Sequence, residues 1–358
     1  MYRRGVLVSR VRTNVAGPAR QIVARWLEMG RFDGALSRRL ADVHARLARH
    51  AVARPLRVPM RADGASLFTI TVGGATLGGS GRTRVALACA AELASRGVQV
   101  VLVGHAYGAK ALAPRIVATS DALGIVGDEA LACARALAAF PNVRVVVGPT
   151  RQAAIDHAAA LAPCVDAVVI DGPLQLAPER ASLSILALDA EAPWGAGALP
   201  PAGDLRAPRD ALLAHADHVV LVDTTPRGAA IDGNRVALAE IGAARLGIFT
   251  ALARPERLLR ALERSGIVAK TIVRAADHGP LTSILRGRVL DAPVDLWLAT
   301  EKCATHLDAI EPRGRVAILD GSLVLPEVLR DALRGSVRSN DAIRIGGARV
   351  GHAPTCVA

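Results

Sequence analysis

Residues 67–84 read LFTITVGGATLGGSGRTR, and this stretch decides the fold. The unbroken apolar run at its start predicts a buried β-strand, and residues 83–95 that follow it predict an α-helix. Between them, residues 73–81 contain five glycines. A Gly-rich turn between a strand and a helix presents backbone N–H groups, and the positive end of the helix dipole, to a phosphate. The stretch therefore predicts a phosphate-binding loop.

The end of this loop resembles the G-K-[ST] ending of P-loop proteins, in which a cation contacts the β- and γ-phosphates and a hydroxyl binds Mg²⁺. Here Arg82 stands at the position of the Lys, and Thr83 supplies the hydroxyl. The loop does not match G-x-G-x-x-G, which disfavours a nicotinamide cofactor. We expect ATP and Mg²⁺ as ligands. The predicted nucleotide-contacting residues are Thr76, Gly78, Gly79, Ser80, Gly81, Arg82 and Thr83.

Beyond the loop, β-rich apolar runs alternate with Ala-rich helical stretches. Continuous Val/Ile/Leu strands separated by helices indicate a mostly parallel sheet with helices on both faces, an α/β fold like that of P-loop NTPases. We predict a nucleotide-binding α/β domain over 61–225 and a smaller C-terminal α/β domain over 226–358. The predicted strands are 67–74, 98–104, 143–148, 165–171, 182–189 and 218–223, then 245–252, 268–273, 295–300 and 316–320; the predicted helices are 83–95, 127–139, 151–161 and 254–265.

The positive charge is concentrated at the N-terminal end. The chain of 358 residues has a net charge of +12, and residues 1–60 hold 13 arginines and three acids. Leu36, Leu40, Val43 and Leu47 recur at helical spacing, so 1–60 is predicted to be a basic helical arm. Two uses of this arm are open, and one arm can serve both: its apolar face packs on the main domain, and it lies on an anionic membrane surface.

Composition excludes several classes of protein. Hydrophobic residues make up 51% of the chain, which is enough for a sizeable core. Aromatic residues make up only 3%, which argues against an RNA-binding module built on stacked rings. No nucleic-acid recognition motif accompanies the basic arm, so we expect no nucleic-acid partner. No apolar run reaches the roughly 18 residues of a membrane-spanning helix.

Nine short motifs, in order, resemble those of the lipid A 4′-kinases (tetraacyldisaccharide 4′-kinases). They extend over about 230 residues. They are VGGATLGGSGRTR (72–84), GHAYG (104–108), GDEALACAR (127–135), VVVGPTRQAA (145–154), DGPLQL (171–176), LPPAGDLRAP (199–208), LARPERL (252–258), the pair Asp277-His278, and TEKC (300–303).

The resemblance implies an activity and a place in the cell. Such kinases transfer the γ-phosphate of ATP to the 4′-hydroxyl of a tetraacyldisaccharide 1-phosphate and give lipid IVA, with Mg²⁺. They are cytoplasmic and peripheral on the inner face of the cytoplasmic membrane. The lipid A disaccharide precursor is therefore the expected substrate, and an anionic membrane surface the expected partner.

The resemblance also implies roles for individual residues. Asp128 is expected to be the general base, assisted by His278, while Arg82 clamps the phosphates. Thr83 and Asp171 are expected to bind the metal, since Asp171 ends a predicted strand as a Walker-B carboxylate does. Three further residues are candidates for contacts with the substrate or its phosphate: Tyr107, Arg151 and Arg206.

The sequence departs from the family pattern at four positions. The Lys of the loop is Arg82, one of two adjacent Asp is missing beside Asp171, and two motif acids are replaced by Ala207 and Cys303. These changes keep two alternatives open: a pseudokinase that binds nucleotide or lipid without turnover, and a membrane-associated P-loop ATPase.

Overall fold

The computed structural model describes residues 22–335, apart from 24, 62–63, 107–108, 110, 162–163, 242–244 and 279–280. Its larger sheet has seven strands in the order β4-β5-β3-β6-β2-β8-β9, and every neighbouring pair except β4–β5 is parallel. The mostly parallel sheet predicted from the sequence is confirmed. The strands are β2 (Phe68–Gly74), β3 (Val100–Val103), β4 (Arg115–Ile116), β5 (Val143–Val147), β6 (Ala167–Asp171), β8 (Leu183–Asp189) and β9 (His218–Val222).

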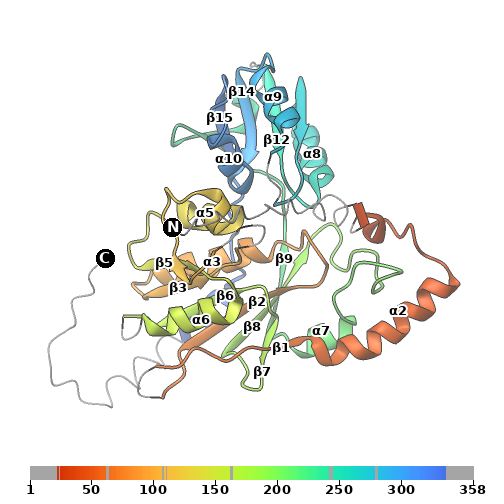
Figure 1. Cartoon of the computed structure of the whole chain (residues 1–358), viewed down its shortest axis with the longest axis vertical. Coiled ribbons are helices and arrows are strands. Elements are labelled where there is room, and N and C mark those ends of the chain that lie inside the picture. Colours follow the sequence, from red (N-terminus) through yellow and green to blue (C-terminus); the bar gives the residue numbers. More distant parts are fainter. Residues whose placement is uncertain are drawn as a thin grey trace, which may run out of the picture.

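Helices cover both faces of this sheet (Figure 1). One face packs into a core with α3 and α5, and the other into a core with α6. The strands are buried on both sides because Val, Ile and Leu occupy consecutive positions rather than alternate ones. The helices of this domain are α3 (Arg82–Ala94), α4 (Leu123–Val126), α5 (Asp128–Ala136), α6 (Arg151–Ala160) and α7 (Arg209–Ala214).

A second sheet of six strands forms the smaller domain, in the order β11-β10-β15-β14-β12-β13. Strands β15, β14, β12 and β13 are parallel, and the short β10 and β11 add an antiparallel edge that the sequence did not predict. The elements are β10 (Ala229–Ile231), β11 (Asn234–Val236), β12 (Leu246–Thr250), α8 (Pro255–Arg264), β13 (Thr271–Arg274), α9 (Ser283–Leu290), β14 (Leu296–Thr300), α10 (Glu301–Asp308) and β15 (Arg315–Leu319).

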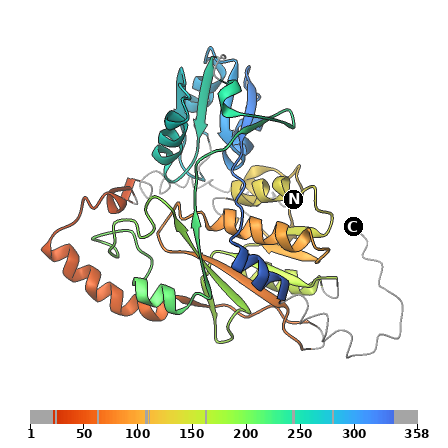
Figure 2. The ribbon, with the colours of Figure 1, turned by 180° about the vertical axis from the view of Figure 1, so that it is seen from behind.

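The chain returns to the first domain after β15, as Figure 2 shows from behind. Leu325, Leu329 and Leu333 lie in the core that also contains β2 and α3. Leu329 and Leu333 lie on one face of the helical segment 327–335, and Leu325 precedes it, so this segment is buried against the larger domain. The two domains meet where α10 packs against α5.

Residues 1–21 of the predicted arm lie outside the described residues. The described part starts with a helical segment near residue 25 and continues as α2 (Ala35–Ala48), which extends to one side of the larger domain (Figure 1). The side chains of α2 that pack against the first domain are small ones, such as Ala41 and Ala48, while His44 contacts the carbonyl of Pro200 at 2.9 Å. Leu36, Val43 and Leu47 are 72%, 55% and 70% exposed. The apolar face therefore does not pack on the main domain, which removes one of the two uses left open by the sequence. A two-stranded parallel pair, β1 (Ala53–Pro55) with β7 (Gln175–Ala177), ties the arm to the sheet.

Candidate functional site

The glycine-rich loop runs from the end of β2 to the first turn of α3. Gly79 and Gly81 have φ angles of +66° and +77°, a conformation that side chains with a Cβ rarely adopt. A Cβ on Gly81 would also lie 2.8 Å from Cβ of Val222, and one on Gly79 would lie 2.6 Å from Cδ of Arg254. The glycines thus let the loop curl between β9 and α8 and bring the N-terminus of α3 to its open side.

The loop is braced from the segment 199–208. Arg206 Nε donates to the carbonyl of Thr76 at 2.6 Å, and the backbone N–H of Leu77 donates to the carbonyl of Asp204 at 2.9 Å. Thr76 Oγ1 donates to the carbonyl of Gly78 at 2.8 Å. Thr76 and Arg206 therefore shape the loop through its carbonyl groups, a contribution that the sequence did not predict for either residue. Loss of water around the guanidinium, together with the nearby arginines, lowers the pKa of Arg206 to about 10.

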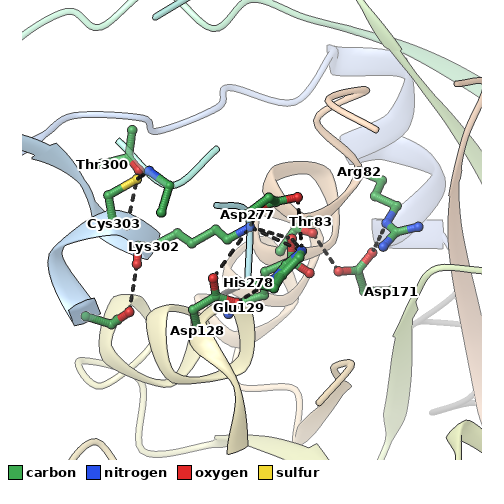
Figure 3. Close-up of polar contacts among 12 residues, drawn as sticks. Arg82, Thr83, Asp128, Glu129, Asp171, Asp277, His278, Thr300, Lys302 and Cys303 are labelled. Carbon is green, nitrogen blue, oxygen red and sulfur yellow. Dashed lines mark hydrogen bonds and ion pairs between the residues drawn. The ribbon is translucent and has the colours of Figure 1, made fainter. Parts of the chain in front are cut away.

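Arg82, Thr83 and Asp171 come together at the carboxyl end of the central strands (Figure 3). Thr83 Oγ1 donates to Asp171 Oδ2 at 2.7 Å, and Arg82 Nε lies 3.1 Å from Asp171 Oδ1. Burial raises the pKa of Asp171 although Arg82 opposes this shift. A hydroxyl and a carboxylate, side by side below a phosphate loop, are the hard oxygen ligands that Mg²⁺ prefers. The pair predicted as the metal site is thus adjacent and chemically suited to Mg²⁺.

Asp128 and His278 form a second centre, across the boundary of the two domains. Asp128 is the first residue of α5, and His278 precedes α9 with a φ angle of +55°. His278 Nδ1–H donates to Asp128 Oδ1 at 2.7 Å. Asp128 is only 3% exposed, whereas the side chain of His278 is 12% exposed, so the imidazole is the more accessible member of the pair. The hydrogen bonds from His278 and His306 outweigh burial and lower the pKa of Asp128 far below its ordinary value.

Four more charged or imidazole side chains surround this pair. They come from α5, from α10 and from the loop before α9. Lys302 Nζ lies 3.3 Å from His278 Nε2, and it also contacts the carboxylates of Asp128, Glu129 and Asp277. His306 Nε2 lies 3.2 Å from Asp128 Oδ2. Burial acts against the charge of Lys302, but the three carboxylates outweigh it and raise the pKa of Lys302 above its ordinary value.

Arg151 and Tyr107 complete the set predicted from the sequence. Arg151 begins α6, and its guanidinium lies directly over Gly172, where any Cβ would overlap it. Burial and the neighbouring Arg82 lower the pKa of Arg151. Arg151 therefore lies beside the Arg82–Asp171 pair, while Tyr107 lies outside the described residues.

The sequence did not assign roles to Glu129, Lys302 or His306. One signal for Lys302 was available: it is one of only three lysines in a chain with 44 basic residues. The motif TEKC (300–303) pointed only to the replacement of an acid by Cys303 and gave Lys302 no role. No local pattern marks His306, because its role depends on the packing of α10 against α5.

A parallel sheet with a glycine-rich loop after a central strand, a Thr–Asp pair at the end of the loop, and an Asp–His pair opposite define a nucleotide-dependent phosphotransferase of the P-loop class. Comparison with known proteins gives the family. The family model described as tetraacyldisaccharide-1-P 4′-kinase matches residues 35–338. The chain belongs to the tetraacyldisaccharide 4′-kinase family, as the motifs indicated.

Individual relatives agree with this assignment. A tetraacyldisaccharide 4′-kinase of Anaeromyxobacter dehalogenans is 34% identical over 307 residues, which cover 74% of this chain and 78% of that protein. The enzyme of the same name from Chromobacterium violaceum is 33% identical over 258 residues, 66% of this chain and 73% of that protein. The crystal structure of LpxK from Aquifex aeolicus in complex with ATP has the same fold, with a TM-score of 0.61 and 19% identity over 88% of this chain and 99% of that one.

Proposed function

We propose that this chain transfers the γ-phosphoryl group of ATP to the 4′-hydroxyl of a tetraacyldisaccharide 1-phosphate, a step of lipid A biosynthesis. Family membership supports the reaction. The observation that supports the proposal is that the hydrogen-bonded pair Asp128 and His278 lies close to Arg82 and Thr83 of the loop (Figure 3). Phosphoryl transfer needs this combination of a positioned phosphate and a base for the incoming hydroxyl.

The proton of the sugar hydroxyl passes to the Asp128–His278 pair. The sequence-based hypothesis gave this role to Asp128 itself. Because Asp128 is buried and hydrogen-bonded through both carboxylate oxygens, we assign the accepting atom to Nε2 of His278, with Asp128 stabilising the imidazolium that forms. The sugar oxygen then bonds to the γ-phosphorus, the bond from that phosphorus to the β–γ bridging oxygen breaks, and ADP leaves.

The loop and its neighbours hold the nucleotide. Backbone N–H groups at the start of α3 face the phosphates, and Arg82 supplies the cation in place of Lys. Thr83 and Asp171 would hold Mg²⁺, directly or through its waters. When bound, Mg²⁺ neutralises charge that develops on the phosphate oxygens. Arg82 also pairs with Asp171, so the phosphates and this carboxylate compete for its guanidinium.

Arg151, Tyr107 and Arg206 are our candidates for contacts with the substrate or its phosphate. Arg206 lies beside the phosphate loop, where it donates to the carbonyl of Thr76. Burial, together with the nearby Arg82 and Arg54, lowers the pKa of Arg151 and of Arg206, so this side of the site is strongly cationic. A lipid that carries a phosphate on one sugar matches that charge, because guanidinium groups bind phosphate through paired hydrogen bonds.

The arm supports a peripheral position on an anionic membrane. The apolar face of α2 is exposed, and the segment before it adds exposed Trp26, Met29 and Phe32. No helix within the described residues is long and apolar enough to cross a bilayer. We propose that α2 lies in the headgroup region with its leucines toward the acyl chains, which would bring the site to a lipid substrate at the inner face of the cytoplasmic membrane.

A direct assay tests the reaction. The purified chain is incubated with Mg·ATP and tetraacyldisaccharide 1-phosphate, and the lipid product is analysed by mass spectrometry with fragmentation. The proposal expects one added phosphate on the distal sugar, stoichiometric ADP, and loss of product in the variant Thr83→Val. Nucleotide binding without any lipid product, in the presence of an active relative as positive control, would refute it in favour of the pseudokinase; ADP formation that needs no disaccharide would favour the ATPase.

A further inference from the structure

Lys302 makes several polar contacts with the Asp128–His278 centre, although the sequence assigned it no role. It lies in the first turn of α10, and its Nζ contacts four side chains: Asp128, Glu129, Asp277 and His278. The side chain is only 15% exposed. Burying an ammonium group costs free energy unless opposite charges lie beside it. The carboxylates of this cluster supply those charges and stabilise Lys302 in its buried position.

The contact with His278 differs from the others in its chemistry. An ammonium group can only donate a hydrogen bond, so the 3.3 Å contact is favourable only when Nε2 of His278 is unprotonated. In that state the other nitrogen, Nδ1, carries the proton that it donates to Asp128. Lys302 and Asp128 thus select one neutral tautomer from opposite sides of the ring.

Without Lys302, a different state of His278 would be favoured. Asp277 Oδ2 lies 3.4 Å from Nε2 and Glu129 Oε1 lies 3.7 Å from it. A protonated imidazole could donate to Asp128 through Nδ1 and to Asp277 through Nε2, with both of its nitrogens blocked. Burial lowers the pKa of His278 and so does Lys302, but the carboxylates of Asp128 and Glu129 outweigh them and raise it above its ordinary value. The ammonium is therefore the main charge that works against this blocked state.

The other basic groups near the imidazole of His278 do not take over the role of Lys302 in opposing protonation of Nε2. His306 is directed at the far oxygen of Asp128, and Arg82 is paired with Asp171. His105 is kept uncharged at neutral pH, because burial and the nearby arginines lower its pKa to about 4. Among the described residues, the charged and titratable groups near His278 include Asp128 and Glu129 from α5, Asp277 from its own loop, Lys302 from α10, and, further away, His306, Arg82 and His105.

We propose that Lys302 is a positioning residue of the kinase reaction, which keeps Nε2 of His278 free of a proton and aimed as an acceptor until the sugar hydroxyl takes the place of the ammonium. This inference rests on the proposed role of His278 as proton acceptor. Because Lys302 and His278 belong to the smaller domain and Asp128 to the larger one, the acceptor has this state only when the two domains are in contact.

The test uses Lys302→Met, which keeps the length of the side chain and removes its charge. Lys270→Met is the matched control, since Lys270 is an exposed lysine of the same domain. Histidine labelled with ¹⁵N reports the tautomer and the titration midpoint of each ring, and His278→Gln identifies the signal of His278. The wild type should show the Nδ1–H tautomer above the midpoint. In Lys302→Met the midpoint should rise by about one pH unit, and the control should leave it unchanged.

Kinetics provide the second readout. In Lys302→Met, the acid limb of the pH profile of kcat/KM for the disaccharide, which reports the free enzyme, should move to higher pH by the same amount, while the KM for Mg·ATP stays within about twofold, because the loop is untouched. If Lys302→Met does not fold, Asp277→Asn serves instead. It removes the carboxylate that faces Nε2, and the midpoint of His278 should then fall.

Two results would overturn the proposal. One is an unchanged midpoint and tautomer of His278 in Lys302→Met with reduced activity, which would make Lys302 only a clamp between the domains. The other is a wild-type signal with Nε2 protonated throughout the neutral range. Both are read from the NMR titration without substrate, so they are distinguishable from a failure of the kinase assay, which would refute the proposed function instead.

Discussion

Replacing two leucines on the exposed face of α2, Leu40→Ser with Leu47→Ser, should release the protein from membranes. Complete burial of a Leu or Val side chain contributes about 1.5–3 kcal/mol. Weighted by the exposed fractions of 51% and 70%, these two leucines contribute about 2–3.5 kcal/mol to membrane binding. Since each 1.4 kcal/mol is a tenfold change in affinity, the variant should bind about 30- to 300-fold more weakly.

The positive charge of α2 contributes less to membrane binding than its exposed apolar face does. Arg38 is paired with Asp33 and Arg49 with Asp210, each at 2.6 Å. Among the described residues, only Arg39 and Arg46 of α2 make no such pair, and a basic residue near an anionic surface contributes about 1 kcal/mol. We therefore expect the serine variant to bind more weakly than the wild type even at low salt.

Co-sedimentation with vesicles of phosphatidylethanolamine and phosphatidylglycerol measures both effects. The control carries Val268→Ser and Ile284→Ser, two residues of the smaller domain that are 83% and 71% exposed. It should bind like the wild type. Equal binding of the Leu40/Leu47 variant and the control would refute the assignment of α2 as an apolar membrane contact.

Three further outcomes follow from the site. Asp128→Asn should lower kcat by about 10²- to 10⁴-fold with little change in the KM for ATP, because the pair acts in proton transfer; an equal loss of ATP affinity, measured by calorimetry, would place Asp128 on the metal instead. Arg82→Ala should abolish Mg·ATP binding and Arg82→Lys should strengthen it, because a flexible ammonium releases Asp171 more easily than a planar guanidinium; weaker nucleotide binding by the lysine variant in the same calorimetric titration would mean that the loop is adapted to arginine. Burial raises the pKa of Glu301 to about 7, against an ordinary value of 4.5, so its ionisation destabilises the folded state as pH rises between these values. Glu301→Gln should therefore raise the free energy of unfolding at pH 8 by about 1–3 kcal/mol and change it little at pH 4.5, as urea titrations will show; equal effects at both pH values would contradict this.

Much of the fold could be predicted because its signals are local. The strand–loop–helix of residues 67–95, the other Val-rich strands and the periodic face of α2 each depend on residues that are neighbours in the sequence. The boundaries of the longer elements were off by only one to three residues. The short strands β10 and β11 escaped prediction because their pairing is decided by β15, which lies more than 80 residues away.

The sequence by itself determined the fold class, the phosphate loop, the Thr83–Asp171 pair and the family, since each follows from residue types at fixed spacing. The tertiary structure alone decided which groups surround the proton acceptor. Lys302 lies 174 positions after Asp128 in the chain and contacts it only because α10 packs on α5. It also decided that the apolar face of α2 is exposed, because helical periodicity marks an apolar face but not what covers it.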